Sequence, residues 1–121
     1  MSPEDLQSLS SVIDSKALLA RCLNNLDFAE RILALFENRG AVELAELDRA
    51  LEAGDVETVS RIAHRLSGAC ANAAAVELQI CASNLRTAAN QNSLPDMSAG
   101  LKELHGEWQK FVDAMPAERV G

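Results

Sequence analysis

The sequence is poor in aromatic residues, with three Phe, one Trp and no Tyr among its 121 residues. β-branched residues are also sparse, and alanine and leucine supply most of the 48% of residues that are hydrophobic. That balance favours helices over strands. No internal repeat, low-complexity tract or strand-like alternation competes with this interpretation. The length is that of one domain, so we expect a single all-α domain.

Positive charge is scarce, because 11 Lys and Arg stand against 18 Asp and Glu and give a formal net charge of −7. Nucleic acids and anionic membrane surfaces both require a basic surface. No apolar run approaches the roughly 18 residues that span a bilayer. The N-terminal MSPEDLQSLS is too acidic and polar for a signal peptide. The sequence therefore predicts a cytoplasmic protein, monomeric because its core is covered, with no nucleic acid or membrane as a partner.

The three cysteines, Cys22, Cys70 and Cys81, are odd in number and show no C-x-x-C spacing. All three fall in apolar helical runs, which favours reduced, buried thiols over redox or metal-binding ones. No paired Glu, Glu-x-x-His set or other metal-ligand cluster occurs at bundle spacing, and no glycine-rich phosphate loop is present. We therefore predict no metal, no cofactor and no enzyme that binds ATP by itself.

Helix caps and stops divide the chain into segments. Ser2 and Asp14 have the character of N-cap residues and predict two short helices within residues 3–23. Gly54 is expected to end one long amphipathic helix, and Asp55 to begin the next. The predicted long helices cover residues 26–53, 55–72, 73–90 and 95–115.

Four long amphipathic helices with short connections predict an antiparallel up-down-up-down four-helix bundle, with the short N-terminal helices packed on it. Gly40 interrupts the apolar stripe of the first long helix, so it either kinks that helix or lets another approach closely. Asn72 is the expected break between the second and third long helices. In the last helix, Trp108 is predicted to lie in the core and His105 at a helix boundary.

His64 lies in the stretch AHRLSGACA, inside the helix predicted over residues 55–72. Rotation about the helix axis is counted from Val59 at about 100° per residue. The apolar stripe then averages roughly 30–40° to one side of Val59, and His64 lies about 140° to the other side. The histidine is therefore predicted to be exposed, which excludes a buried core histidine. A functionally unimportant surface histidine stays open as an alternative.

The neighbours of His64 suggest covalent chemistry. Gly68, one turn later, removes side-chain bulk beside the imidazole, while Arg61 and Ser67 place a cation and a hydroxyl nearby. Arg65 lies off this face, although its long side chain could wrap toward it. Neutral imidazole is a nucleophile near pH 7, and an oxyanion attached to it would accept charge-assisted hydrogen bonds from arginine. This arrangement favours transient phosphorylation, with the phosphoryl group arriving from one protein and leaving to another.

At these residues the sequence resembles a known family. The run AHRLSGACANAAAVELQICASNL, preceded by LDRALEAGDVETVSRIAH, resembles the signature of histidine phosphotransfer (HPt) domains of two-component phosphorelays. His64, Leu66 and Gly68 match the signature, and the resemblance covers roughly residues 13–112 of what we take as one domain over residues 1–121.

The resemblance implies a phosphocarrier that is not an enzyme. His64 would exchange a phosphoryl group, usually through its Nε2 atom, with aspartates of response-regulator receiver domains, and a sensor or hybrid histidine kinase would be the further partner. The receiver would bring the Mg²⁺, and transfer would be in line. Leu18 and Leu19 of the short N-terminal helices, taken as exposed, would join the His64 face as the docking surface.

Two positions depart from the family pattern. Ser67 stands where the family usually has a lysine that stabilises the phosphoryl group, and Arg61 or Arg65 is expected to take over that role. Ala74 stands where the family often has glycine, and Asn72 is expected to supply the left-handed residue of that turn. Because Ser67 carries no charge, a helical interaction module without phosphotransfer is the alternative function. A third alternative, an enzyme or a helical bundle that binds a cofactor, would require ligating side chains that face the interior of the bundle.

Overall fold

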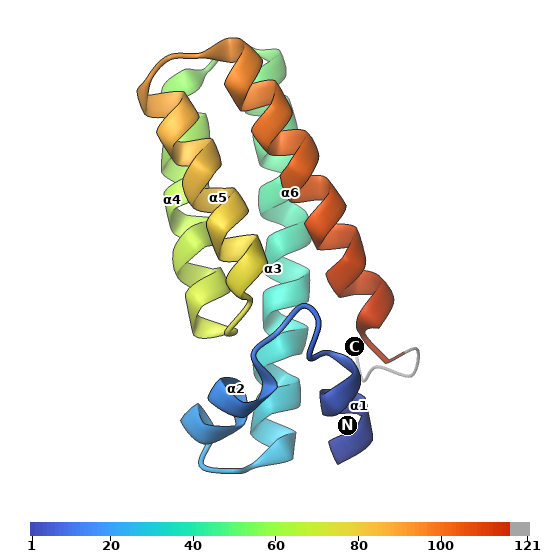
Figure 1. The fold of residues 1–121 in the computed structure, drawn as a ribbon. Helices are drawn as coiled ribbons and strands as arrows, with labels where there is room; N and C mark the ends of the chain where they lie inside the picture. The colour runs from blue at the N-terminus through green and yellow to red at the C-terminus, as the bar shows by residue number, and fades with distance from the viewer. Residues whose placement is uncertain (117–121) are drawn as a thin grey trace.

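The structure, a computed structural model, describes residues 1–116, which form six helices and no strand (Figure 1). The helices are α1 (Pro3–Ser8), α2 (Ser15–Arg21), α3 (Leu26–Glu52), α4 (Val56–Asn72), α5 (Val76–Asn90) and α6 (Leu94–Ala114). The all-α fold predicted from composition is therefore confirmed for the described residues. None of these helices combines the length and the apolar character that crossing a membrane requires.

The four long helices pack together as a bundle. α4 packs most extensively along α5, α3 contacts both α4 and α6, and α5 also contacts α6 (Figure 1). Each helix turns one apolar stripe inward, as its sequence pattern predicts. The largest fully buried side chains of this core are Leu33, Leu47, Ile62, Leu66, Leu78, Leu85, Leu104 and Phe111, with Leu9, Ile13, Leu18 and Met97 toward its ends.

Side-chain caps set most helix starts. Each cap accepts a hydrogen bond from the backbone N–H three residues later, which satisfies one of the unpaired donors of the first turn. These capping residues are Ser2, Asp14, Asn25, Asp55 and Ser93. Gly54 ends the α3 segment with φ of 68°, a left-handed conformation that costs glycine little. The caps and the stop predicted from sequence are confirmed.

The α4–α5 turn differs from the prediction. Asn72 is still helical, and the left-handed residue is Ala74, with φ of 58°. The turn occupies Ala73, Ala74 and Ala75, so α5 begins at Val76 rather than at residue 73. Local hydrogen bonds close this turn, with Ala75 N donating to Cys70 O at 2.9 Å, and Asp14 N adds a tertiary bond to Ala74 O at 2.8 Å. The prediction for Asn72 was wrong because α4 continues through Asn72 and the chain reverses two residues later, where an alanine gives no left-handed signal in the sequence.

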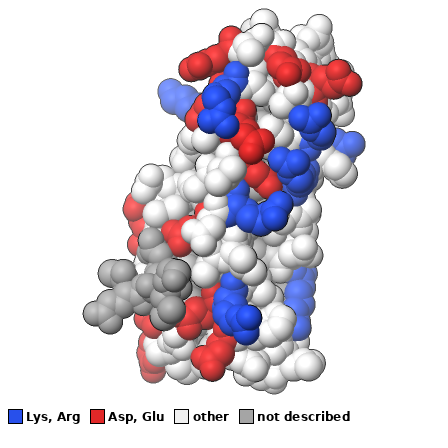
Figure 2. All heavy atoms as spheres, turned by 180° about the vertical axis from the view of Figure 1, so that it is seen from behind, with Lys and Arg blue, Asp and Glu red and all other residues white. Residues whose placement is uncertain are grey.

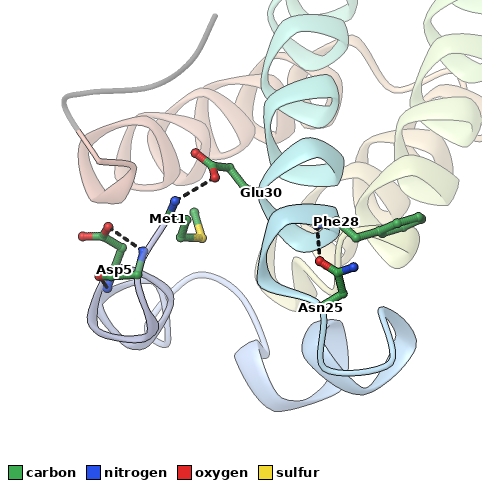
Figure 3. A network of polar contacts seen from close by, with 6 residues as sticks. Met1, Asp5, Asn25, Phe28 and Glu30 are labelled. Carbon is green, nitrogen blue, oxygen red and sulfur yellow. Dashed lines mark hydrogen bonds and ion pairs between the residues drawn. The ribbon is translucent and has the colours of Figure 1, made fainter.

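The N-terminal helices close one end of the bundle beside α3 (Figure 1). The Met1 amino group donates to Glu30 Oε2 at 2.7 Å and so ties the chain start to α3 (Figure 3). Leu18 is fully buried and Leu19 half-buried against the core. The predicted exposure was therefore wrong for Leu18 and only partly right for Leu19, because α2 packs these leucines against the core at the end of the bundle.

Gly40 lies against the indole of Trp108. A Cβ atom at Gly40 would lie well inside van der Waals contact with the six-membered ring of that indole. The glycine therefore lets α6 approach α3, which is one of its two predicted roles. Trp108 is buried, as predicted, and its ring centroid lies 5.4 Å from that of Phe36 and 5.3 Å from that of Phe111.

His105 lies inside α6 and not at a helix boundary, so that prediction was wrong. Its Nε2 atom lies 2.8 Å from Asp48 Oδ1 on α3, within hydrogen-bond distance. The residue therefore joins two long helices, a contact between distant segments that its neighbours in sequence do not reveal.

The three cysteines are buried and free, as their apolar surroundings predict. Burial raises the pKa of Cys70 to about 12 and also raises the pKa of Cys81. Since the thiolate is the reactive form, the thiols of Cys70 and Cys81 are poor nucleophiles at neutral pH. In residues 1–116, no three His, Cys, Asp or Glu side chains are grouped in a way that could hold a metal ion.

Candidate functional site

His64 lies in the middle of α4 and is exposed. Val59, Ile62 and Leu66 of the same helix are almost completely buried, so the histidine lies on the outward side of the helix as predicted. The Asp55 cap anchors the start of α4. Hydrogen bonds from the Thr58 side chain and backbone hold the pKa of Asp55 below its usual value, so this cap is charged at neutral pH.

Two hydrogen bonds join the His64 side of α4 to α5. Ser60 Oγ donates to Asn90 Oδ1 at 2.7 Å, one turn before His64. The hydroxyl groups of Ser67 and Ser83 lie 3.1 Å apart, one turn after it. His64 therefore lies above the groove between α4 and α5, and the two helices run antiparallel there.

Ser67, where the family usually has a lysine, is half-buried, and its hydroxyl pairs with that of Ser83. A hydroxyl in this pair is a neutral group and carries no positive charge to the imidazole. Ser67 is therefore close to His64 on α4, but its hydroxyl group pairs with Ser83 and so joins α4 to α5.

Arg65 is directed toward α3. Its Nε atom lies 3.4 Å from Glu43 Oε1, and one of its terminal nitrogens lies 3.7 Å from Glu46 Oε2. Glu43 is only 4% exposed, and its Oε2 atom has no hydrogen-bond partner among the described residues. Arg39 adds a second cation at 4.0 Å from Glu43 Oε1. The ion pairs of Arg65 therefore lead away from the α5 side, where Ser60 and Ser67 place the histidine.

Gly68 leaves open space one turn after His64. A Cβ atom built on this glycine has no neighbouring atom within 4 Å. Arg61 is exposed one turn before the histidine, and residues 1–116 offer it no ion pair. On the outer face of α4, Gly68 thus leaves room without side-chain bulk and Arg61 carries a positive charge. His64 lies between them, as predicted.

An apolar stripe on α3 runs beside α4. Phe28, Leu35 and Val42 are 51%, 62% and 58% exposed and follow each other at seven-residue spacing, which places them on one side of the helix. A shallow groove of about 430 Å³ separates part of this stripe from α4, between Leu35 on α3 and Ala69 on α4. Figure 2 shows the molecule from behind, where basic side chains lie among acidic ones over the upper half of the surface and again near its lower end. The stripe was not predicted, although its seven-residue spacing can be seen in the sequence.

These features define a class of protein: an all-helical bundle with an exposed histidine in the middle of one long helix and an open surface next to it. The family model for the Hpt domain matches residues 31–117, which is more than half of the chain. The chain therefore belongs to the Hpt domain family, as the resemblance in AHRLSGACA indicated. Members of this family act as phosphocarriers in phosphorelays with kinases and receiver domains. Neither a curated protein nor a solved structure matches the chain significantly.

Proposed function

We propose that this chain relays phosphoryl groups between His64 and aspartates on response-regulator receiver domains, with a sensor or hybrid histidine kinase upstream. The observation that carries the proposal is an exposed imidazole in the middle of α4, with open space at Gly68, in a chain of the Hpt family. A cytoplasmic monomer is the form in which we expect it to act.

The transfer step needs only the imidazole from this chain. The Nε2 lone pair of neutral His64 attacks the phosphorus of a receiver aspartyl phosphate. An N–P bond forms, the P–O bond to the aspartate breaks, and the carboxylate leaves with the electron pair while Nδ1 keeps its proton. The reverse step passes the group to another receiver. The receiver supplies the Mg²⁺ for this step, and this chain supplies no cofactor.

The receiver would dock over the outer face of α4 and the α3 stripe of Phe28, Leu35 and Val42. Exposed apolar side chains there would be covered on binding, and the space at Gly68 admits the approach that in-line transfer requires. This surface replaces the one expected from Leu18 and Leu19. The proposal takes α3–α6 as an up-down-up-down bundle, which the antiparallel α4–α5 pair and the short loops support.

The test uses a receiver domain that carries labelled phosphate and three forms of this chain: wild type, His64→Gln and His105→Gln. These are the only two histidines in the sequence, so the second variant is a matched control. Wild type and His105→Gln should acquire an acid-labile, alkali-stable label that His64→Gln does not acquire. The proposal would be contradicted if His64→Gln acquired the phosphate label, or if wild type acquired none from its cognate receiver.

A helical interaction module without phosphotransfer is the second candidate, and the neutral Ser67–Ser83 pair favours it. In that case the receiver would bind wild type and His64→Gln equally, and no phosphate would pass to either.

A further inference from the structure

The two serine hydrogen bonds fix the register between α4 and α5. Ser60 pairs with Asn90 and Ser67 with Ser83, so seven residues forward along α4 correspond to seven residues back along α5. His64 lies four residues after Ser60. The position four residues before Asn90 is Arg86, which the register therefore places opposite His64 across the α4–α5 groove.

The helical rotation of α5 agrees with this register. Leu85, Ala82 and Ala89 are buried and define the core side of the helix. Ser83 and Asn90 define the side that meets α4, and Arg86 lies within about 60° of both in rotation about the helix axis. Arg86 is thus on the α4-facing border of α5, not on its far side.

Arg86 is exposed, and none of the ion pairs or hydrogen bonds among residues 1–116 engages its side chain. In this it differs from Arg65, which is next to His64 in sequence but is held by Glu43 and Glu46 on α3. Moving Arg65 to His64 would leave the buried Glu43 carboxylate with Arg39 as its remaining cation, whereas moving Arg86 breaks no contact of this kind.

We propose that Arg86, across the α4–α5 groove from His64, supplies the positive charge that stabilises a phosphoryl group on His64. It would take the role that the family usually gives to a lysine at the position of Ser67. Packed helices lie about 8–10 Å apart, and an extended arginine side chain crosses most of such a distance. Its guanidinium can donate two parallel hydrogen bonds to phosphoryl oxygens. This inference rests on the phosphotransfer function proposed above.

Phosphoramidate is a suitable probe, because it phosphorylates imidazole without a partner protein. The Nε2 lone pair of His64 attacks the phosphorus, the P–N bond of the donor breaks, and the protonated nitrogen leaves as ammonia. Arg86 takes no part in bond making. The Arg86 guanidinium binds the phosphoryl oxygens. These oxygens carry more negative charge in phosphohistidine than in a loose transition state for hydrolysis. Arg86 therefore stabilises phosphohistidine more than that transition state and should lengthen its lifetime.

The experiment measures the phosphohistidine lifetime after removal of the donor, in wild type and in Arg86→Gln, Arg86→Lys and Arg61→Gln. Arg31→Gln is the matched control, because it removes an exposed arginine from the first turns of α3. Arg86→Gln should shorten the lifetime about threefold to tenfold, the range expected for one charge-assisted contact at an exposed site. Arg86→Lys should keep most of the lifetime, and Arg31→Gln all of it.

Two further measurements separate a direct role from a structural one. Adding Ser67→Lys to Arg86→Gln should restore the lifetime, because it returns a cation to the same side of the imidazole. The phosphoryl ³¹P signal should titrate at higher pH in Arg86→Gln than in wild type, since a nearby cation favours the dianion. Thermal unfolding should show that all variants are folded.

The outcomes are distinguishable. If wild type takes no phosphate from the donor or from its receiver, the proposed function fails, and this inference fails with it. If wild type is phosphorylated but Arg86→Gln has the wild-type lifetime, Arg86 is not the stabilising residue and only this inference is overturned. A shorter phosphohistidine lifetime in Arg61→Gln, with a wild-type lifetime in Arg86→Gln, would likewise overturn the inference for Arg86.

Discussion

Arg65 on α4 and Glu43 on α3 form an ion pair in which the carboxylate side chain is 5% exposed and the guanidinium side chain 47% exposed, with 3.4 Å between Nε and Oε1. The pair joins two helices of the bundle next to His64 without pointing at it. This geometry assigns Arg65 to the stability of the α3–α4 contact.

Arg65→Gln should therefore destabilise the fold. Removing Arg65 leaves the buried Glu43 carboxylate with less positive charge nearby. We expect the free energy of unfolding to fall by about 2 kcal/mol. The loss is limited to this value because Arg65 is half exposed and Arg39 stays near Glu43. Denaturant unfolding measures the loss. Glu43→Gln in the same chain should recover part of it, and an unchanged unfolding midpoint in Arg65→Gln would contradict this assignment.

Gly68→Gln should separate folding from transfer. A Cβ atom at Gly68 has no neighbouring atom within 4 Å, so the helix should be as stable as wild type or more stable by up to about 1 kcal/mol. The same side chain would project where a receiver must approach His64, so phosphotransfer should slow by at least about tenfold, as for a 1.4 kcal/mol rise in the barrier. Thermal unfolding and transfer from a labelled receiver measure the two effects. Transfer at the wild-type rate would refute the role of this open space in docking.

Gly40 and Gly106 offer a matched pair of substitutions in helix interiors. Gly40→Ala places a methyl group against the ring of Trp108 and should cost about 1–3 kcal/mol as the core repacks. Gly106→Ala places the same group in open space and should stabilise the protein by about 0.4–1 kcal/mol. Equal effects of the two substitutions in denaturant unfolding would show that Trp108 does not require the glycine.

Ala74→Gly should stabilise the protein. Ala74 takes φ of 58° in the α4–α5 turn, where a Cβ atom costs roughly 1–2 kcal/mol. Removing it should raise the free energy of unfolding by about 1 kcal/mol, reduced by the entropy that glycine gains in the unfolded chain. Ala71→Gly, three residues earlier inside α4, is the control and should destabilise by about 1 kcal/mol. A loss of stability in Ala74→Gly would contradict the left-handed assignment.

Local signals in the sequence were sufficient for much of the fold. A capping residue such as Asp55 and a stop such as Gly54 act within one helical turn, so their roles can be predicted from neighbours alone. The exposure of His64 could also be predicted, because rotation along one helix determines which side chains share a face.

Contacts between helices were not predictable in the same way. The burial of Leu18 and the His105–Asp48 contact each depend on a segment far away in the chain. The position of Arg86 opposite His64 likewise depends on the α4–α5 register, which the Ser60–Asn90 hydrogen bond reveals only in the folded molecule. Residues near the histidine in sequence, such as Arg65, were therefore favoured over residues near it in space.

The most direct test of phosphotransfer through His64 is a ¹H–¹⁵N spectrum of the histidine rings before and after incubation with a phosphorylated receiver. The sequence contains two histidines, so two ring systems are observed, and His105→Gln assigns them. If His64 carries the phosphoryl group, the His64 ring alone shifts and its Nε2 atom shows coupling to phosphorus. Coupling at the His105 ring, or no coupling at either ring while the receiver loses its phosphate to water, would contradict phosphotransfer through His64.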